Sequence, residues 1–283
     1  MLSVNTNPGA LVALENLNNT ATQLQQAQSE VSTGLAVASP EDNGAVWAIA
    51  QGERATESSL DAVKSSLQTG QSIIDVATSA GTTVSDLLSQ MKETALSASD
   101  SSLDTNSRAA LNTQFTALVG QINTAISNAD FNGVNLLNGS LSNITSLANA
   151  DGTSVITTLA QNFALAGTTT TQAGAGSIIT VSSGATISTV TAATAMIATV
   201  QTSLTNVDDA LATMGTSSKS LGGQLTFVGN LQDSLETGIG NLVNDNLAKE
   251  SATLTALQTK QQLGIQALSI ANSSSSALLG LFR

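Results

Sequence analysis

The sequence predicts a mainly α-helical protein: a long antiparallel helical bundle or coiled coil formed by the N- and C-terminal segments, with a small β-rich insert in the middle. Three observations support this fold class. Apolar residues recur at alternating steps of three and four along most of the chain, which is the heptad spacing of packed helices. Both prolines fall at or before residue 40, so no proline breaks the helices that follow. Residues 132–190 lose the periodicity and are rich in Gly, Thr, Ser and Asn.

Residues 1–40 are expected to form the first terminal helix. Its apolar seam runs from Ala10 to Leu35, and Pro8 stands before its start. Pro40 and the Asn43-Gly44 pair follow the seam, and this combination indicates that the first helix stops and the chain crosses to a second one.

Residues 41–131 are expected to supply the N-terminal part of the bundle. A seam begins at Val46 and Ile49, weakens, and then continues from Leu60 to Ala98. The polar stretch at 97–107 suits a turn and a helix N-cap. A shorter seam then runs through residues 111–129.

Residues 132–190 are expected to form a variable, β-rich outer insert. Short β-like runs occur at 154–159, 178–181 and 185–190. Ser183-Gly184 separates the last two runs and is a candidate hairpin turn.

Residues 191–240 complete the bundle, and residues 241–283 form the second terminal helix. The longest seam runs without a slip from Ile197 to Leu242 and resumes at Val243, which predicts a break within 238–246. Because the two arms that flank the insert must return toward each other, we expect the chain ends to lie side by side.

Composition excludes several classes of function. The net charge of −12 argues against binding to nucleic acid or to an anionic membrane surface, and no apolar run is long enough to span a membrane. The absence of Cys and His removes thiol catalysis, His bases and the common zinc sites, so we predict no enzyme activity, no cofactor and no metal site. The first residues lack the pattern of a cleaved secretory signal, which indicates a cytosolic chain or export without cleavage.

The terminal helices carry apolar residues on more than one face, which indicates burial on more than one side. Two isolated helices with Ala-rich seams gain little free energy, so we expect them to become ordered when other copies pack around them. Head-to-tail contacts of that kind produce an open helical filament unless they close into a ring. The predicted polymerisation residues are Leu11, Leu14, Leu17, Leu24, Val31, Leu35, Leu254, Leu257, Leu268, Ile270, Leu278, Leu279, Leu281 and Phe282.

The sequence resembles bacterial flagellin, most closely the alphaproteobacterial type. The resemblance covers roughly three quarters of the chain and lies in the opening segment with STGLAVASPEDNGAVWAIA (32–50), the long second helix, the FNGVNLLNGS turn (131–140) and the closing ALSIANSSSSALLGLFR (267–283). Finding both terminal patterns in one chain is highly specific.

The resemblance implies a subunit of the extracellular flagellar filament that serves swimming motility. The terminal helix pair would line the inner tube of the filament, and the chain would be exported unfolded by the flagellar type III system. The implied partners are further copies of the chain, an export chaperone at the C-terminal helix, and hook-associated and cap proteins. Outer segments of related flagellins often carry O-linked sugars, and the candidate positions here are Thr168, Thr169, Thr170, Thr171, Ser177, Ser182 and Ser183.

Two alternatives stay open at this point. A hook–filament junction protein shares the terminal helices, although the short insert and the ALSIAN ending favour the filament subunit. An enzyme on a helical scaffold is supported only by scattered carboxylates.

Overall fold

The computed structural model describes residues 7–167 and 176–280, with side chains described up to Ser273. Five helices and three small two-stranded sheets make up this part of the chain. The chain forms two compact units, one from residues up to Thr56 together with those from Asp233 onward, and one from Glu57 to Gln232. The mainly helical fold class with a small β insert is confirmed.

The first helix, α1 (Pro8–Thr33), begins and ends at recognisable caps. The Asn7 side chain accepts a hydrogen bond from the Ala10 N–H at 3.2 Å, and Pro8 occupies the first helical position, where its missing N–H costs nothing. Gly34 then adopts a φ of 73° and donates its N–H to the Glu30 carbonyl. The predicted stop before residue 40 is therefore confirmed.

The second helix, α2 (Pro40–Ala98), is interrupted near its start and regular thereafter. Asn43 has extended backbone angles, and its side chain accepts from the Val46 N–H, so it caps the regular part. Every seam position from Leu60 to Ala98 is buried, as predicted. The prediction that Ile49 lies on the buried seam is wrong. Ile49 is 55% exposed, and the neighbouring Ala50, which is 1% exposed, occupies the buried position instead. The weak seam positions before Leu60 allow this one-residue shift in the buried face.

In the second unit, α3 (Thr105–Ser127) joins α2 across a capped loop. The Asp104 carboxylate accepts hydrogen bonds from the backbone N–H groups of Ser107 and Asn106, and these bonds hold the pKa of Asp104 below its ordinary value. The Arg108 guanidinium donates to three carbonyls of the same loop, at 2.8–3.2 Å. Phe115 and Ile122 then enter the core fully buried, as the third seam predicts.

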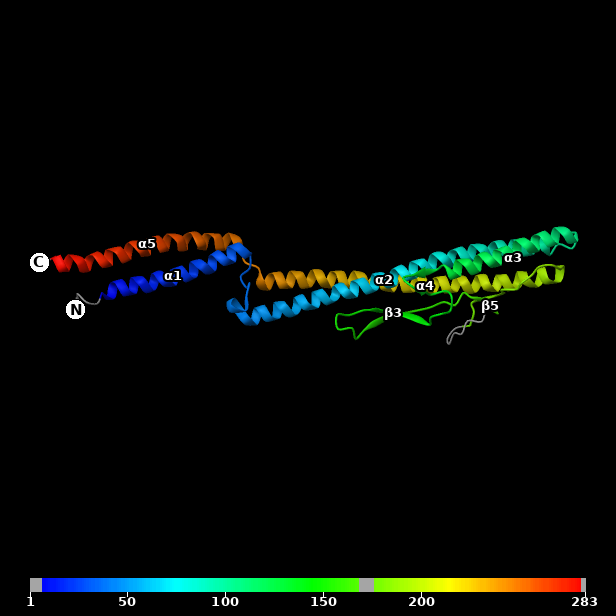
Figure 1. Cartoon of the computed structure of the whole chain (residues 1–283), viewed down its shortest axis with the longest axis horizontal. Helices are drawn as coiled ribbons and strands as arrows, with labels where there is room; N and C mark the ends of the chain where they lie inside the picture. The colour runs from blue at the N-terminus through cyan, green and yellow to red at the C-terminus, as the bar shows by residue number, and fades with distance from the viewer. Residues whose placement is uncertain (1–6, 168–175, 281–283) are drawn as a thin grey trace. The chain divides into compact units, whose positions relative to one another are not determined.

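The fourth helix, α4 (Val190–Val243), is confirmed as one long helix, followed by a break and by α5 (Leu247–Gly280). Along α4, fully buried Val200, Val207 and Val228 alternate with half-buried seam residues. Figure 1 shows α2, α3 and α4 running alongside one another in the second unit.

The β region contains three separate pairs. β1 (Asp130–Phe131) and β2 (Val134–Asn135) form a tight antiparallel pair, β3 (Asn143–Leu147) and β4 (Val155–Leu159) form an antiparallel hairpin, and β5 (Leu165–Ala166) pairs parallel with β6 (Ile179–Ser182). The predicted hairpin at Ser183-Gly184 is wrong, because residues 185–189 form no strand. Instead the Ile187 N–H donates to the Asn112 side chain on α3 at 2.7 Å, and Ile187 is buried.

The β3–β4 hairpin packs closely on the helices of the second unit. The Leu147 N–H donates to Ser66 Oγ, and Gln224 Nε2 donates to the Ala148 carbonyl at 2.7 Å. At Gly70 the approach is so close that a Cβ would collide with Ser146 Oγ. A side chain at this position of α2 would therefore have to displace the Ser146 hydroxyl.

Candidate self-association surface

α1 and α5 pack against each other in antiparallel orientation within the first unit (Figure 1). At one end, Asn7 Nδ2 donates to the Ala271 carbonyl at 2.7 Å. At the other end, the Asp245 N–H donates to the Gly34 carbonyl at 3.0 Å. The predicted neighbourhood of the two chain ends is therefore confirmed.

The linkers at residues 34–37 and 243–245, here called the linker junction, hold the two helices together. Leu35 and Asn244 form an isolated antiparallel bridge, and the N–H groups of Ala36 and Val37 both donate to the Val243 carbonyl. Leu35 and Val37 also pack on a small apolar cluster of Ala50, Ile239 and Val243. Backbone pairing and a small core thus fix the inner end of the helix pair.

The contact between α1 and α5 buries small side chains. Thr20 and Ala27 are the buried residues of α1, and no side chain of α5 between Leu247 and Ser273 is fully buried. A Cβ built on Gly264 would lie 3.3 Å from Leu17 Cδ1, so the two helices approach closely there. Since stabilisation by burial scales with the apolar area removed from water, this contact contributes less than a closed core in which large apolar side chains are fully buried.

The large apolar residues predicted for polymerisation differ in their exposure. Leu11, Leu14 and Ile270 are 62%, 43% and 70% exposed. The half-buried members of the predicted set are Leu17, Leu24, Val31, Leu35, Leu254, Leu257 and Leu268.

The remaining predicted residues fall at the end of the chain. Leu278 and Leu279 belong to α5, but their side chains are outside the described part, and Leu281 and Phe282 lie outside the described residues. The other predicted residues therefore lie on α1, on α5 up to Ile270, or, for Leu35, in the linker junction, and their role in polymerisation stays a prediction.

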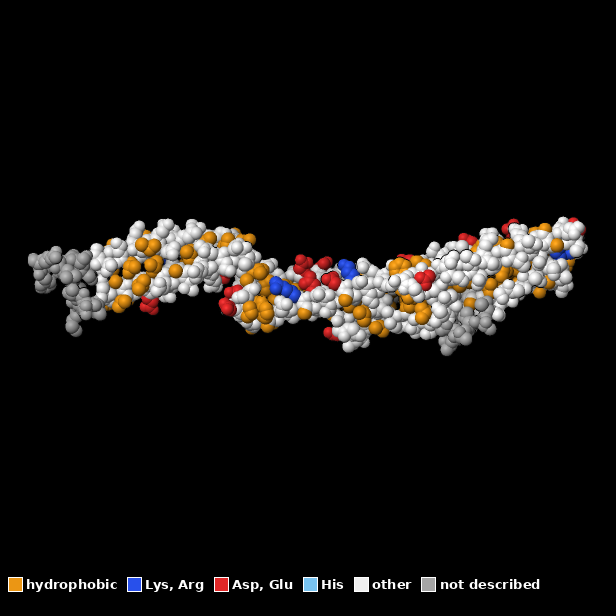
Figure 2. Space-filling view, viewed as in Figure 1, with side chains coloured by type: hydrophobic (Ala, Val, Ile, Leu, Met, Phe, Trp, Pro, Cys, Tyr) orange, Lys and Arg blue, Asp and Glu red, His pale blue; other side chains and the backbone are white. Residues whose placement is uncertain are grey.

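The predicted set omits several exposed apolar residues of the described part of the pair, of which Leu263, at 60%, is the most exposed. Heptad steps counted from Val243 reach Gln261 and Gly264, so Leu263 lies off the predicted seam. An apolar residue off the seam is the sequence signal that could have identified it. Val12 and Ile265 are further off-seam residues, at 57% and 54% exposed. Figure 2 shows orange apolar side chains along the described part of the pair with few charged side chains among them.

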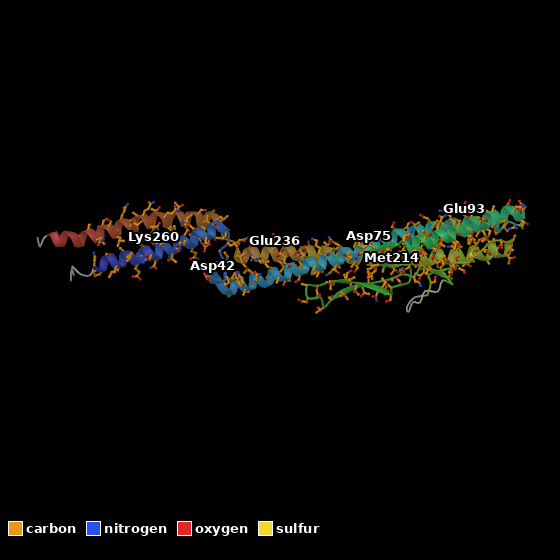
Figure 3. The ribbon with its side chains drawn as sticks, viewed as in Figure 1. Asp42, Asp75, Glu93, Met214, Glu236 and Lys260 are labelled. Atoms are coloured by element: carbon orange, nitrogen blue, oxygen red, sulfur yellow. The ribbon has the colours of Figure 1, made fainter. Side chains whose placement is uncertain are left out.

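A groove of about 520 Å³ lies between α1 and α5. Its walls include Val12 and Leu263, while Gly9, Ala13 and Gly264 are small. Among the described residues, Lys260, labelled in Figure 3, is the only charged one that lines it. This shape and composition suit an apolar segment of a partner, and they offer no group for acid–base chemistry beyond one lysine.

Three carboxylates meet beside the linker junction. Oxygen atoms of Glu30, Asp245 and Glu250 all lie within 4.8 Å of one another. Burial raises the pKa of Glu250, and the negative charges of Glu30 and Asp245 raise it further, against a smaller lowering by Lys249. Among the described residues these side chains are the ones placed to hold a hard cation, but acidic groups at surfaces commonly gather without one.

The predicted modification residues are placed only in part. Thr168, Thr169, Thr170 and Thr171 lie outside the described residues. The Ser177 hydroxyl is half-buried and donates to the carbonyls of Ala164 and Ile179, whereas Ser182 and Ser183 are exposed.

Within the described residues, no helix combines the length and the apolar character that crossing a membrane requires. Two family descriptions match the chain: the bacterial flagellin N-terminal helical region at residues 4–142, and the bacterial flagellin C-terminal helical region at residues 197–282. Both terminal helices fall within these matches.

Curated relatives match over essentially their full length. Flagellin FljK of Caulobacter vibrioides is 52% identical over 281 residues, covering 99% of this chain and 98% of that protein. Flagellin FljN of the same organism is 54% identical with the same coverage. A flagellin of Brucella melitensis is 35% identical and covers all of both chains. The chain therefore belongs to the bacterial flagellin family, and to its alphaproteobacterial type.

Proposed function

We propose that this chain is the structural subunit of a flagellar filament and that it polymerises through its terminal helix pair. One observation carries the proposal: large apolar side chains of α1 and α5, including Leu11, Leu263 and Ile270, are more than half exposed. Family membership supplies the context, since flagellins are the subunits of such filaments.

The energetics of the pair favour covering by further copies. The fully buried side chains of the pair are few and small, while each ordered residue costs about 1.5 kcal/mol of conformational entropy. Isolated helices are marginal in water, and most helix stability in proteins comes from packing of an apolar face. Neighbouring copies would cover the exposed side chains and supply the missing contacts.

The finer parts of the proposal follow from the family. The subunit would leave the cell unfolded through the flagellar type III system and act in an extracellular filament that serves swimming. An export chaperone would cover the C-terminal helix before export, and hook-associated and cap proteins would contact the two ends of the filament. For O-linked sugars, exposed Ser182 and Ser183 are better placed than Ser177, whose hydroxyl is engaged by backbone carbonyls.

The alternatives have less support. Matches over at least 98% of the length of several flagellins favour a filament subunit over a hook–filament junction protein. The family is one of structural proteins, and an enzyme on this scaffold has only the carboxylates at the linker junction to recommend it.

Electron microscopy of purified protein after nucleation by salt or by filament seeds tests the proposal. We expect long tubes from the full chain and none after deletion of residues 267–283. Thermal unfolding by circular dichroism should show that the second unit still folds in the deletion variant, because it contains none of the deleted residues. Tubes from the deletion variant would contradict a role for the terminal pair, and soluble protein from the full chain under all nucleating conditions would contradict polymerisation itself.

A further inference from the structure

We propose that Asn132, in the turn between β1 and β2, is a site of spontaneous deamidation, and that Asp130 limits the rate of this reaction. The sequence contains three Asn-Gly pairs, at 43–44, 132–133 and 138–139. In such a pair the glycine nitrogen can attack the carboxamide carbon of the asparagine, because glycine has no Cβ to obstruct the approach. The surroundings of the three pairs differ, and they favour the second. The inference does not depend on the proposed polymerisation.

The Asn132-Gly133 pair forms the two-residue turn that joins β1 to β2, with a φ of 53° at Asn132 and 80° at Gly133. Positive φ at both positions explains why the turn uses this dipeptide. Both residues are exposed, a Cβ built on Gly133 would meet only open space, and the Asn132 carboxamide has no hydrogen-bond partner among the described residues. Since β1 and β2 contain two residues each, the turn can change shape at little cost.

The other two pairs are held in place by their neighbours. The Asn138 side chain accepts a hydrogen bond from a nearby backbone N–H at 2.8 Å. Gly139 is buried against the Asn162 side chain, which a Cβ would approach to 2.7 Å. The Asn43 side chain accepts a hydrogen bond from the Val46 N–H and caps the regular part of α2. Because these contacts must break before the asparagine can react, we expect both pairs to convert more slowly than Asn132.

The reaction needs water as its one co-reactant. The nitrogen of Gly133 forms a bond to Cγ of Asn132, the Cγ–Nδ2 bond breaks, and the proton of the attacking nitrogen leaves with the ammonia. The product is a five-membered cyclic imide, which then takes up water. Addition of water at Cγ yields aspartate, whereas addition at the backbone carbonyl carbon yields isoaspartate, in which the main chain runs through Cγ.

Asp130 contacts the nitrogen that has to react. Its Oδ1 accepts a hydrogen bond from the Gly133 N–H at 2.9 Å. The attacking nitrogen must give up the proton of this bond, and the negative charge of the carboxylate opposes the negative charge that develops on a deprotonated amide. Asp130 therefore slows the attack, and its replacement by an uncharged residue should accelerate the reaction.

Conversion of Asn132 changes the turn in two ways. Either product adds a negative charge close to Asp130. Isoaspartate also lengthens the main chain of the turn, so the antiparallel register of β1 and β2 is disturbed. Asn135, which pairs with Asp130 in that register, is buried and donates its Nδ2 to the Ile126 carbonyl at 2.8 Å. The modification therefore acts where α3 joins the β insert.

Peptide mapping of the full chain after prolonged incubation at neutral pH tests the site, with electron-transfer fragmentation to locate each conversion and to separate isoaspartate from aspartate. The same chain unfolded in guanidinium chloride is the reference, because the contacts of the fold are then absent. We expect similar rates at all three asparagines in the unfolded chain, and conversion of Asn132 about tenfold faster than that of Asn138 in the folded chain. Equal rates in the folded chain, or a faster conversion of Asn43 or Asn138, would overturn the inference.

Asp130→Ala tests the role of the carboxylate, and Asp151→Ala is the matched control, because Asp151 is an exposed carboxylate in the loop between β3 and β4. We expect a several-fold higher rate at Asn132 in Asp130→Ala and the natural rate in the control. A slow conversion of Asn138 in the same sample shows that the surrounding fold is intact. An unchanged or lower rate at Asn132 in Asp130→Ala would refute the role of Asp130.

Discussion

Replacing Ile270 by serine tests how far neighbouring copies cover the exposed apolar side chains of the α1–α5 pair. Ile270 is 70% exposed in the single chain. Full burial of an isoleucine side chain contributes about 1.5–3 kcal/mol, so covering its exposed part contributes about 1–2 kcal/mol per subunit on assembly. With a factor of ten for each 1.4 kcal/mol, Ile270→Ser should raise the critical concentration for polymerisation about 5- to 30-fold.

The assay is sedimentation of polymer at a series of total protein concentrations, with the protein left in the supernatant giving the critical concentration. Leu159→Ser is the matched control, because Leu159 is 58% exposed on the β3–β4 hairpin and outside the terminal pair. We expect the control to stay within about twofold of the natural chain, in line with the small effect of most surface substitutions. An unchanged critical concentration for Ile270→Ser, or an equal rise for both variants, would refute the reasoning.

Three further predictions concern the stability of the two units. Gly70→Ala should destabilise the second unit by about 1–3 kcal/mol in thermal denaturation, because its Cβ collides with Ser146 Oγ; an unchanged melting temperature would contradict the close packing. Arg108→Ala should cost about 1–2 kcal/mol through the loss of hydrogen bonds to three loop carbonyls, and Arg108→Lys should not restore them, because an ammonium lacks the planar fork. The raised pKa of Glu250 means that the folded first unit binds a proton at this carboxyl more readily than the unfolded chain does. The free energy of unfolding of this unit should therefore increase as pH falls from neutral toward the ordinary pKa of 4.5, and decrease as pH rises through the raised pKa. Glu250→Gln should flatten that dependence in urea unfolding followed by the fluorescence of Trp47, the single tryptophan; the same slope in both proteins would exclude Glu250 as its source.

Much of the helical architecture is predictable because it depends on local repeats. The seam from Leu60 to Ala98 has a residue of suitable size at each heptad step, and every position is buried. Asn7 and Asp104 cap helices through side chains that reach only two or three residues along the chain. Such signals need no knowledge of distant partners.

The β insert is less predictable because its pairing depends on segments far apart in the sequence. β5 and β6 are two and four residues long and pair in parallel across residues 167–178, so no adjacent turn sequence signals the contact. The hairpin expected at Ser183-Gly184 fails because Asn112, on a distant helix, takes the N–H of Ile187. Short runs of β-branched residues predict a strand but do not choose its partner.

The candidate self-association surface is also only partly predictable from the sequence. The sequence by itself determined the long helices, the break after Val243 and the excess of apolar residues at both ends, because these follow from periodicity and composition. Only the tertiary structure decided that Leu263 and Ile270 are uncovered, that a groove opens between α1 and α5, and that Glu30, Asp245 and Glu250 meet. Exposure and proximity depend on the rotation and stagger of one helix against another. Those are set by close contacts such as Leu17 with Gly264, and a heptad pattern on either helix alone does not specify them.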